Sequence, residues 1–292
     1  MSDLGVAIDL FGVAWATMLL AAIALAWPGV LVVARGQIVI AIAAAQAAAC
    51  GAAAAMALIG WMGGGHVHGD GRIHLGALLG GLVATALAWR GPVERSGWLF
   101  AAGSAGSVLL VAHSPYGMHD ILALQHSNAL GAGPLEVVGF LVAVGVMAVT
   151  VGRFHRELRL LAVDPAQARA CGLAVGRWNL LIGAALGVLI SVSVSSLGLL
   201  YSFGCLVLPT LVAARLTTAM WPLLILAPAI AVSGAVGGIV VGHAWDLPPG
   251  QSSVAVLVAL YPLAMVAGWL LARCRRRRMP TTAALDEVGD AS

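Results

Sequence analysis

Lysine is absent from this chain of 292 residues, and charged residues of all kinds make up only 9% of it. A nucleotide-binding P-loop needs a lysine on the phosphates, so the motif GxxxxGK[ST] cannot occur. If nucleotide hydrolysis drives this protein, another chain performs it, and we expect no enzymatic activity of its own. Soluble domains carry roughly 25% charged residues, so the low charge also argues against a soluble globular fold.

Cysteine is scarce as well. The four cysteines are Cys50, Cys171, Cys205 and Cys274. They show no CxxC pairing, and two of them lie in apolar runs. A disulfide framework or a zinc knot is therefore not expected. We also expect no nucleic-acid partner and no permanently bound cofactor.

Apolar residues dominate what is present. They make up 61% of the chain, its mean hydropathy is +1.00, and several apolar segments are long enough for a bilayer core of about 30 Å. The sequence predicts an all-α polytopic membrane domain over residues 1–278, followed by a disordered polar tail over 279–292. We expect nine spans, with eight as the alternative: 10–34, 37–62, 75–89, 97–113, 134–152, 178–196, 199–214, 222–243 and 251–272.

The arginines alternate along this layout. Every second junction between spans is basic, and 14 of the 15 arginines fall on one side, with Arg72 as the exception. The positive-inside rule makes that side cytoplasmic. We therefore expect a plasma-membrane protein, in bacteria an inner-membrane protein, with its N-terminus outside and its C-terminus in the cytoplasm.

The histidines follow the opposite pattern. Seven of the eight histidines fall on the outer side: His66, His68, His74, His113, His119, His126 and His243. Asp70 and Asp120 fall on the same side. Neutral imidazole is the commonest protein ligand for zinc and similar ions, so this rim favours metal capture at the outer mouth. The alternative is that polar, glycine-rich loops such as HVHGDGRIH simply hold solvated histidines.

The predicted spans contain almost no acidic residues or histidines. Ion-coupled transporters usually carry such groups inside the membrane, so coupling to an ion gradient is disfavoured and an external ATPase fits better. Gln46 and Cys50 stand four residues apart and share one helix face of the second span. Glu136 follows Pro134 and is interpreted as a helix-capping carboxylate.

A polar island over residues 153–178 interrupts the apolar sequence. It holds a third of the arginines: Arg153, Arg156, Arg159, Arg169 and Arg177. Asp164-Pro165 has the form of a helix cap followed by a first helical residue, and Gly172 is a suitable stop. A short capped helix on the basic side indicates a docking element for a cytoplasmic partner, with an ordinary charged loop as the alternative.

Several segments resemble the metal-ion permeases of ATP-binding-cassette importers, the integral membrane subunits for zinc, manganese or iron. The resemblance is carried by ELRLLAVDPAQARACGL (157–173), GLLYSFGCLVLPTLVAARLTT (198–218) and DLPPGQSSVAV (246–256), and more loosely by GVLVVARGQ (29–37). It implies a type II importer fold. It also implies a homodimer in the lipid membrane, a pair of cytoplasmic ATPase subunits and an external metal-binding protein.

By this resemblance, the segment with Glu157, Asp164, Ala168 and Gly172 is the coupling element that seats in the ATPase. One family feature is missing. Many members carry Asp and His four residues apart on the second span to hold the ion midway, and those positions are Ile42 and Gln46 here. Gln46 could offer only a carbonyl oxygen, so the ion would cross with weaker contacts or depend more on the outer histidines and Asp120.

Four functions remain to be weighed. We favour import of a divalent metal ion, most of all Zn²⁺, because histidines outnumber carboxylates on the outer face. The alternatives within the class are manganese, iron or a metal chelate. Two alternatives belong to other classes of protein. One is a gradient-driven secondary carrier, and the other is an intramembrane enzyme built on GSAGS (103–107), whose spacing does not match that of a rhomboid-type nucleophile.

Overall fold

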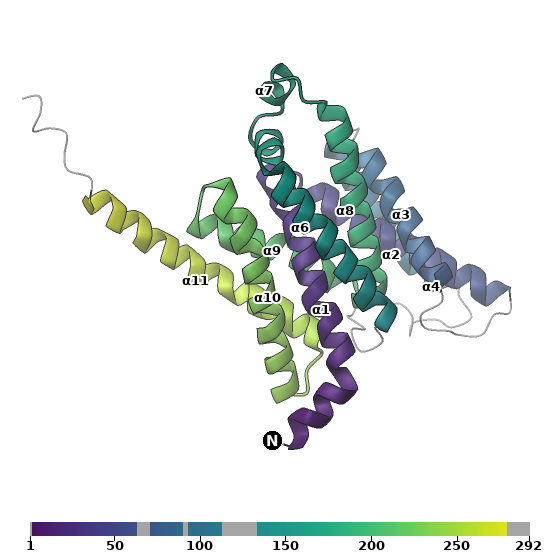
Figure 1. Ribbon diagram of the computed structural model, residues 1–292. Helices are drawn as coiled ribbons and strands as arrows, with labels where there is room; N and C mark the ends of the chain where they lie inside the picture. The colour runs from purple at the N-terminus through teal and green to yellow at the C-terminus, as the bar shows by residue number, and fades with distance from the viewer. Residues whose placement is uncertain (1, 63–70, 90–92, 113–132, 279–292) are drawn as a thin grey trace, which may run out of the picture.

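The computed structural model describes residues 2–62, 71–89, 93–112 and 133–278, and all of its regular structure in these ranges is helical (Figure 1). The helices are α1 (Ser2–Ala34), α2 (Ile38–Trp61), α3 (Gly71–Trp89), α4 (Val93–Ala112), α6 (Pro134–Val163), α7 (Pro165–Ala170), α8 (Val175–Leu197), α9 (Leu199–Leu216), α10 (Met220–Ala244) and α11 (Pro249–Arg278). The prediction of an all-α fold is confirmed.

Eight of the described helices are long and apolar enough to cross a membrane, which makes the chain a multi-pass membrane protein. This count agrees with the alternative of eight spans. The additional segment expected over 97–113 is the helix α4, which is not apolar enough to enter this count. It still runs the same way as α2, with Gly103 against Gln46 and Gly106 against Cys50, and so returns the chain to the end of the bundle where α6 begins. Its charged first turn, with Glu94 and Arg95, and its many serines and glycines lower its hydropathy.

The sixth and seventh predicted spans are separate helices. Gly198 is the single residue between α8 and α9, and its backbone lies at φ 85° and ψ 162°. A residue with a side chain rarely adopts that conformation, so glycine ends α8 here and lets α9 begin at once.

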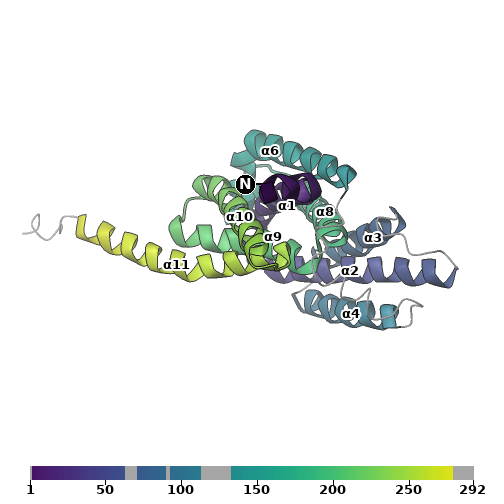
Figure 2. The same ribbon diagram turned by 90° about the horizontal axis from the view of Figure 1, so that it is seen from below.

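Helices α1 and α8 form the centre of the bundle. In the most apolar stretch of α1, 67% of the residues are buried, and in that of α8, 61%. In contrast, only 6% of the corresponding stretch of α6 is buried, so α6 lies at the edge, against α1 (Figure 2). The buried Tyr201 on α9 donates a hydrogen bond to the backbone oxygen of Met18 on α1, at 2.7 Å.

Small residues bring α2 and α3 into close contact. A Cβ atom added to Gly51 of α2 would overlap the carbonyl oxygen of Gly76 on α3, and one added to Gly80 would overlap that of Ala47. Membrane helices gain little from the hydrophobic effect against each other and rely on such close backbone packing. The glycines therefore fix where α3 lies on α2.

Successive long helices alternate in direction, which gives the bundle two distinct ends. The arginine end carries the connections 35–37, 164–174 and 217–219 and the C-terminus of α11, and α7 lies there (Figure 1). The histidine end carries the first turns of α3 and α6, Gly198 and the residues after α10. Among the residues that the structure describes, the arginines other than Arg72 belong to the first end or to its flanking turns.

Candidate functional site

At the arginine end, Asp164 caps the short helix α7. Its carboxylate oxygen Oδ1 accepts hydrogen bonds from the backbone N–H groups of Ala166, at 2.9 Å, and Gln167, at 3.0 Å. Pro165 occupies the first helical position, where its lack of an N–H group costs nothing. The capped helix predicted from Asp164-Pro165 is confirmed.

Gly172 ends α7 at φ 81°, a left-handed conformation that favours glycine. Its N–H group donates to the oxygen of Arg169, and the next N–H group, on Leu173, donates to the oxygen of Ala168, each at 3.0 Å. These bonds satisfy carbonyl groups that the end of a helix leaves free. The predicted stop at Gly172 is likewise confirmed.

The inner side of α7 is packed and its outer side is exposed. Ala168 is fully buried against Leu161 of α6 and Val175 of α8. The exposed residues are Ala166, Gln167, Arg169 and Ala170. A small helix fixed to two long helices and open on its other side is suited to contact another protein and to transmit its movement.

Glu157, the fourth residue expected in the coupling element, lies half-buried on α6 and not on α7 itself. Helix α6 has a kink at Phe154, where the backbone is non-helical. The Phe154 ring meets the Trp178 ring of α8 edge-on, with centroids 5.2 Å apart. Glu157 therefore belongs to the segment between the kink and α7, which packs on the start of α8.

At the histidine end, three helices bring His74, Glu136 and Ser195 together. His74 lies in the first turn of α3, Glu136 in the first turn of α6 and Ser195 in the last turn of α8. The imidazole Nδ1 of His74 is 2.7 Å from the Ser195 hydroxyl, and its Nε2 is 3.8 Å from Glu136 Oε1. The two side chains are 29% and 19% exposed, so the pair is open to solvent and ions.

Hydrogen bonds from neighbouring residues orient the His74 and Glu136 side chains. When the Ser195 hydroxyl donates to the backbone oxygens of Ser191 and Val192, each at 3.1 Å, its oxygen accepts from Nδ1–H of His74. A neutral imidazole with its proton on Nδ1 presents a lone pair at Nε2. Glu136 is fixed on its other oxygen, Oε2, which accepts from the N–H group of Gly133 at 2.9 Å.

In that tautomer, two acceptors face each other across the 3.8 Å between Nε2 and Oε1. Such an arrangement is satisfied by a cation between them, either a proton or a metal ion. Two zinc ligands about 2.1 Å from one ion at a tetrahedral angle are about 3.4 Å apart, so a small side-chain rotation would suffice. Ser195 and Gly133 would orient the two ligands, as outer partners commonly do at metal sites.

The other expected metal ligands divide into two groups. His66, His68, His113, His119, Asp120 and His126 lie outside the described residues, as does the tail 279–292. His243 is exposed in the last turn of α10, with its ring edge-on to Trp15 at 6.4 Å. Within the part of the chain that the structure describes, no three His, Cys, Asp or Glu side chains form a metal-binding group.

Gln46 and Ile42 lie half-buried on α2, on the stretch that meets α4. A Cβ atom on Gly103 of α4 would come within 3.0 Å of the Gln46 backbone oxygen, and one on Gly106 within 2.8 Å of the Cys50 sulfur. This face of α2 is therefore a helix-packing face in the chain.

Sequence reasoning named His74 but missed its partners. The interpretation of Glu136 as a helix-capping carboxylate agrees with its hydrogen bond from Gly133, and Ser195 carried no sequence signal of its own. The signal that could have joined them is positional, since each of the three residues is within a turn of a helix end on the same side of the predicted layout.

The chain was compared with known proteins at the level of sequence family and of fold. The model of the ABC 3 transport family matches residues 8–268. The fold is similar to PsaBC from Streptococcus pneumoniae, solved in complex with a Fab, with a TM-score of 0.74 and 16% identity over 90% of this chain and 94% of that one. It is also similar to an inward-facing transporter described as of metal-chelate type, with a TM-score of 0.70 and 16% identity over 90% and 89%. No protein with a curated function matches the chain.

Proposed function

Because this chain belongs to the ABC 3 transport family, we propose that it is the permease subunit of an ATP-binding-cassette importer for a divalent metal ion. Zinc is the preferred ion, its direction is into the cytoplasm, and separate subunits hydrolyse the ATP. The family match supports the class of transporter, and the observation that carries the mechanism is α7, a rigidly held helix with an exposed outer side.

The coupling role of α7 follows from how it is fixed. Asp164 and Gly172 define its two ends, and Ala168 packs it against α6 and α8. When ATP binding closes a pair of ATPase subunits, a docked helix of this kind moves as a rigid body with its neighbours. The described part of the chain supplies one such helix, so two ATPase subunits call for two copies of the permease.

The metal arrives at the opposite end. His74 and Glu136 present a nitrogen and a carboxylate oxygen, which are donors that zinc accepts well. An external metal-binding protein would deliver the ion there, and lipid surrounds the exposed apolar faces of the bundle. The side with the arginines is then cytoplasmic, in agreement with the positive-inside rule.

Import of a metal chelate is the second candidate. It is favoured by the similarity of fold to the transporter described as of metal-chelate type. The substitution of Ile42 and Gln46 at the positions of the family's mid-span pair also leaves no paired ligands for a bare ion on this face of α2.

Uptake by reconstituted vesicles tests the proposal. The chain, purified with the ATPase subunit that accompanies it from native membranes, is placed in liposomes and given radioactive zinc, manganese or iron, free or chelated. We expect uptake of free zinc that requires ATP and the ATPase subunit. Uptake driven by an ion gradient without ATP would instead identify a secondary carrier, and uptake of chelated metal alone would identify a chelate importer.

A further inference from the structure

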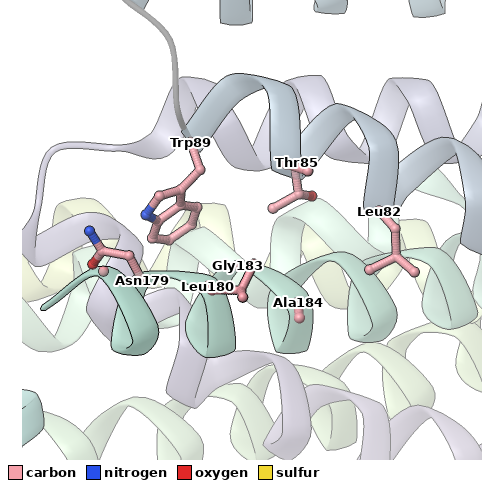
Figure 3. Close-up of a pocket in the computed structure, with 9 residues that line it drawn as sticks. Leu82, Thr85, Trp89, Asn179, Leu180, Gly183 and Ala184 are labelled. Atoms are coloured by element: carbon pink, nitrogen blue, oxygen red, sulfur yellow. The ribbon is translucent and has the colours of Figure 1, made fainter. Parts of the chain in front are cut away.

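A cavity of about 500 Å³ opens between α3 and α8 near the arginine end. Figure 3 shows Leu82, Thr85 and Trp89 of α3 facing Asn179, Gly183 and Ala184 of α8, with the Trp89 indole nitrogen on the side of Asn179. Most of the lining is aliphatic, and the polar groups gather at Trp89 and Asn179. The cavity is therefore amphipathic, with its polar part nearest the arginine end.

Arg35, in the segment GVLVVARGQ, lies behind this polar part. Its Nη2 donates to Asn179 Oδ1 at 2.9 Å, and its guanidinium carbon stacks 5.4 Å from the centre of the Trp89 ring. Partial burial lowers the pKa of Arg35 from its ordinary value, because the charged form loses contact with water. Among the described residues, no carboxylate forms an ion pair with it.

Two hydrogen-bond donors at this place are buried without an acceptor in the described structure: Nη1 of Arg35 and Nε1 of Trp89. A buried donor without a partner is costly, and the cost is larger for a charged group. Asn179 has its oxygen occupied by Arg35, so its amide nitrogen is the group that remains to donate. Two buried donors and the positive charge of Arg35 thus lack a matching anion in the described structure.

The surrounding charge is also positive. Arg177 is exposed directly after the cavity residue Gly176, and Arg95 donates to the Leu87 oxygen at 3.4 Å. Glu94 is the neighbouring negative charge, and it is exposed on α4. Basic pockets between membrane helices on the cytoplasmic side are suited to anionic lipid headgroups.

We propose that this cavity binds the phosphate headgroup of an anionic phospholipid. The phosphate oxygens accept hydrogen bonds from Arg35, Trp89 and Asn179. The acyl chains lie along the exposed apolar residues of α3 and α8, among them Leu87, which is 44% exposed, and Leu180, which is 57% exposed. The lipid site requires only that the chain lie in a bilayer, so it stands apart from the proposed transport activity.

Native mass spectrometry of the full chain in neutral detergent tests this site. Phosphatidylglycerol or phosphatidylcholine is added stepwise, and the apparent affinity for the first lipid is compared. We expect the wild type to prefer phosphatidylglycerol. Arg35→Gln should reduce that preference about tenfold or more, because it removes a charged hydrogen bond, and Trp89→Phe should reduce it several-fold.

Matched controls carry the same chemical changes elsewhere on the arginine end. Trp221→Phe alters an exposed tryptophan of α10, and Arg273→Gln alters an exposed arginine that stacks on Trp269 at 5.0 Å. Both should keep the preference. If they lower it as much as the cavity variants do, or if the cavity variants keep it, the site is refuted.

A second pair of measurements covers the remaining outcomes. Ala184→Leu fills part of the cavity with an aliphatic side chain and leaves Arg35 unchanged. It should also weaken phosphatidylglycerol binding, and it provides the test if Arg35→Gln does not fold. An excess of inorganic phosphate should not displace the lipid. Displacement would overturn the lipid assignment in favour of a soluble phosphate-bearing ligand.

Discussion

The His74 and Glu136 side chains, which we propose as ligands of the imported ion, are each oriented by one neighbouring residue. Ser195 is hydrogen-bonded to Nδ1 of His74, and the N–H group of Gly133 donates to one oxygen of Glu136. Each ligand atom is thereby pointed at the other without a hydrogen bond between them, at 3.8 Å. The pair stands at the end where the proposed import begins.

We expect His74→Gln and Glu136→Gln each to raise the zinc concentration for half-maximal uptake about tenfold or more. Ser195→Ala should have a smaller effect of the same kind, because it removes the partner of Nδ1 but leaves both proposed ligand atoms in place. Concentration dependence of zinc uptake in vesicles measures this. His155→Gln, at the arginine end, should leave the half-maximal concentration unchanged, and unchanged values for both ligand variants would remove the pair from the ion path.

At the scale of an element, α7 is notable for having defined ends despite its six residues. An isolated helix of this length is not stable in water, so its stability comes from its cap, from Gly172 and from the burial of Ala168. These features keep α7 in a fixed relation to α6 and α8. A change at Gly172 should therefore alter the connection between α7 and α8 and spare the bundle.

We expect Gly172→Val to uncouple ATP hydrolysis from transport in a protein that still folds. A β-branched residue is strained at φ 81°, while a Cβ at this position meets no other atom within 4 Å. The measurement is the number of zinc ions transported per ATP hydrolysed. Gly145→Val serves as the control because its Cβ also meets nothing within 4 Å but its φ is not positive. A normal ratio in the Gly172 variant would argue against the docking role.

At the scale of the whole molecule, the two ends of the bundle differ in chemistry, and this difference predicts orientation. Cys171 is an exposed free cysteine directly after α7, whereas Cys205 is buried. In a Cys274→Ser background, a membrane-impermeant maleimide should label Cys171 in inside-out vesicles and not in intact cells. Added ATPase subunit should protect it. Labelling of Cys171 from outside intact cells would reverse the proposed topology.

Much of the fold was accessible from sequence, because hydropathy and arginine placement are local properties summed along the chain. The capped helix at Asp164 was accessible for the same reason, since a cap is defined by neighbours in sequence. The grouping of His74, Glu136 and Ser195 was not, because it depends on how three distant helices pack. The status of α4 was also difficult, because Glu94, Arg95 and several small residues dilute an apolar segment of sufficient length.

The connection at Gly198 has a mechanical consequence. Helix α8 begins just after the connection 164–174 that holds α7 and ends at Leu197, and α9 begins at Leu199. A single residue, Gly198, therefore joins the two membrane helices. An axial shift of α8 must displace the first turn of α9 as well. Ser195 lies on α8 three residues before Gly198, so a shift imposed on α8 at the arginine end would also move the hydrogen-bond partner of His74 at the histidine end.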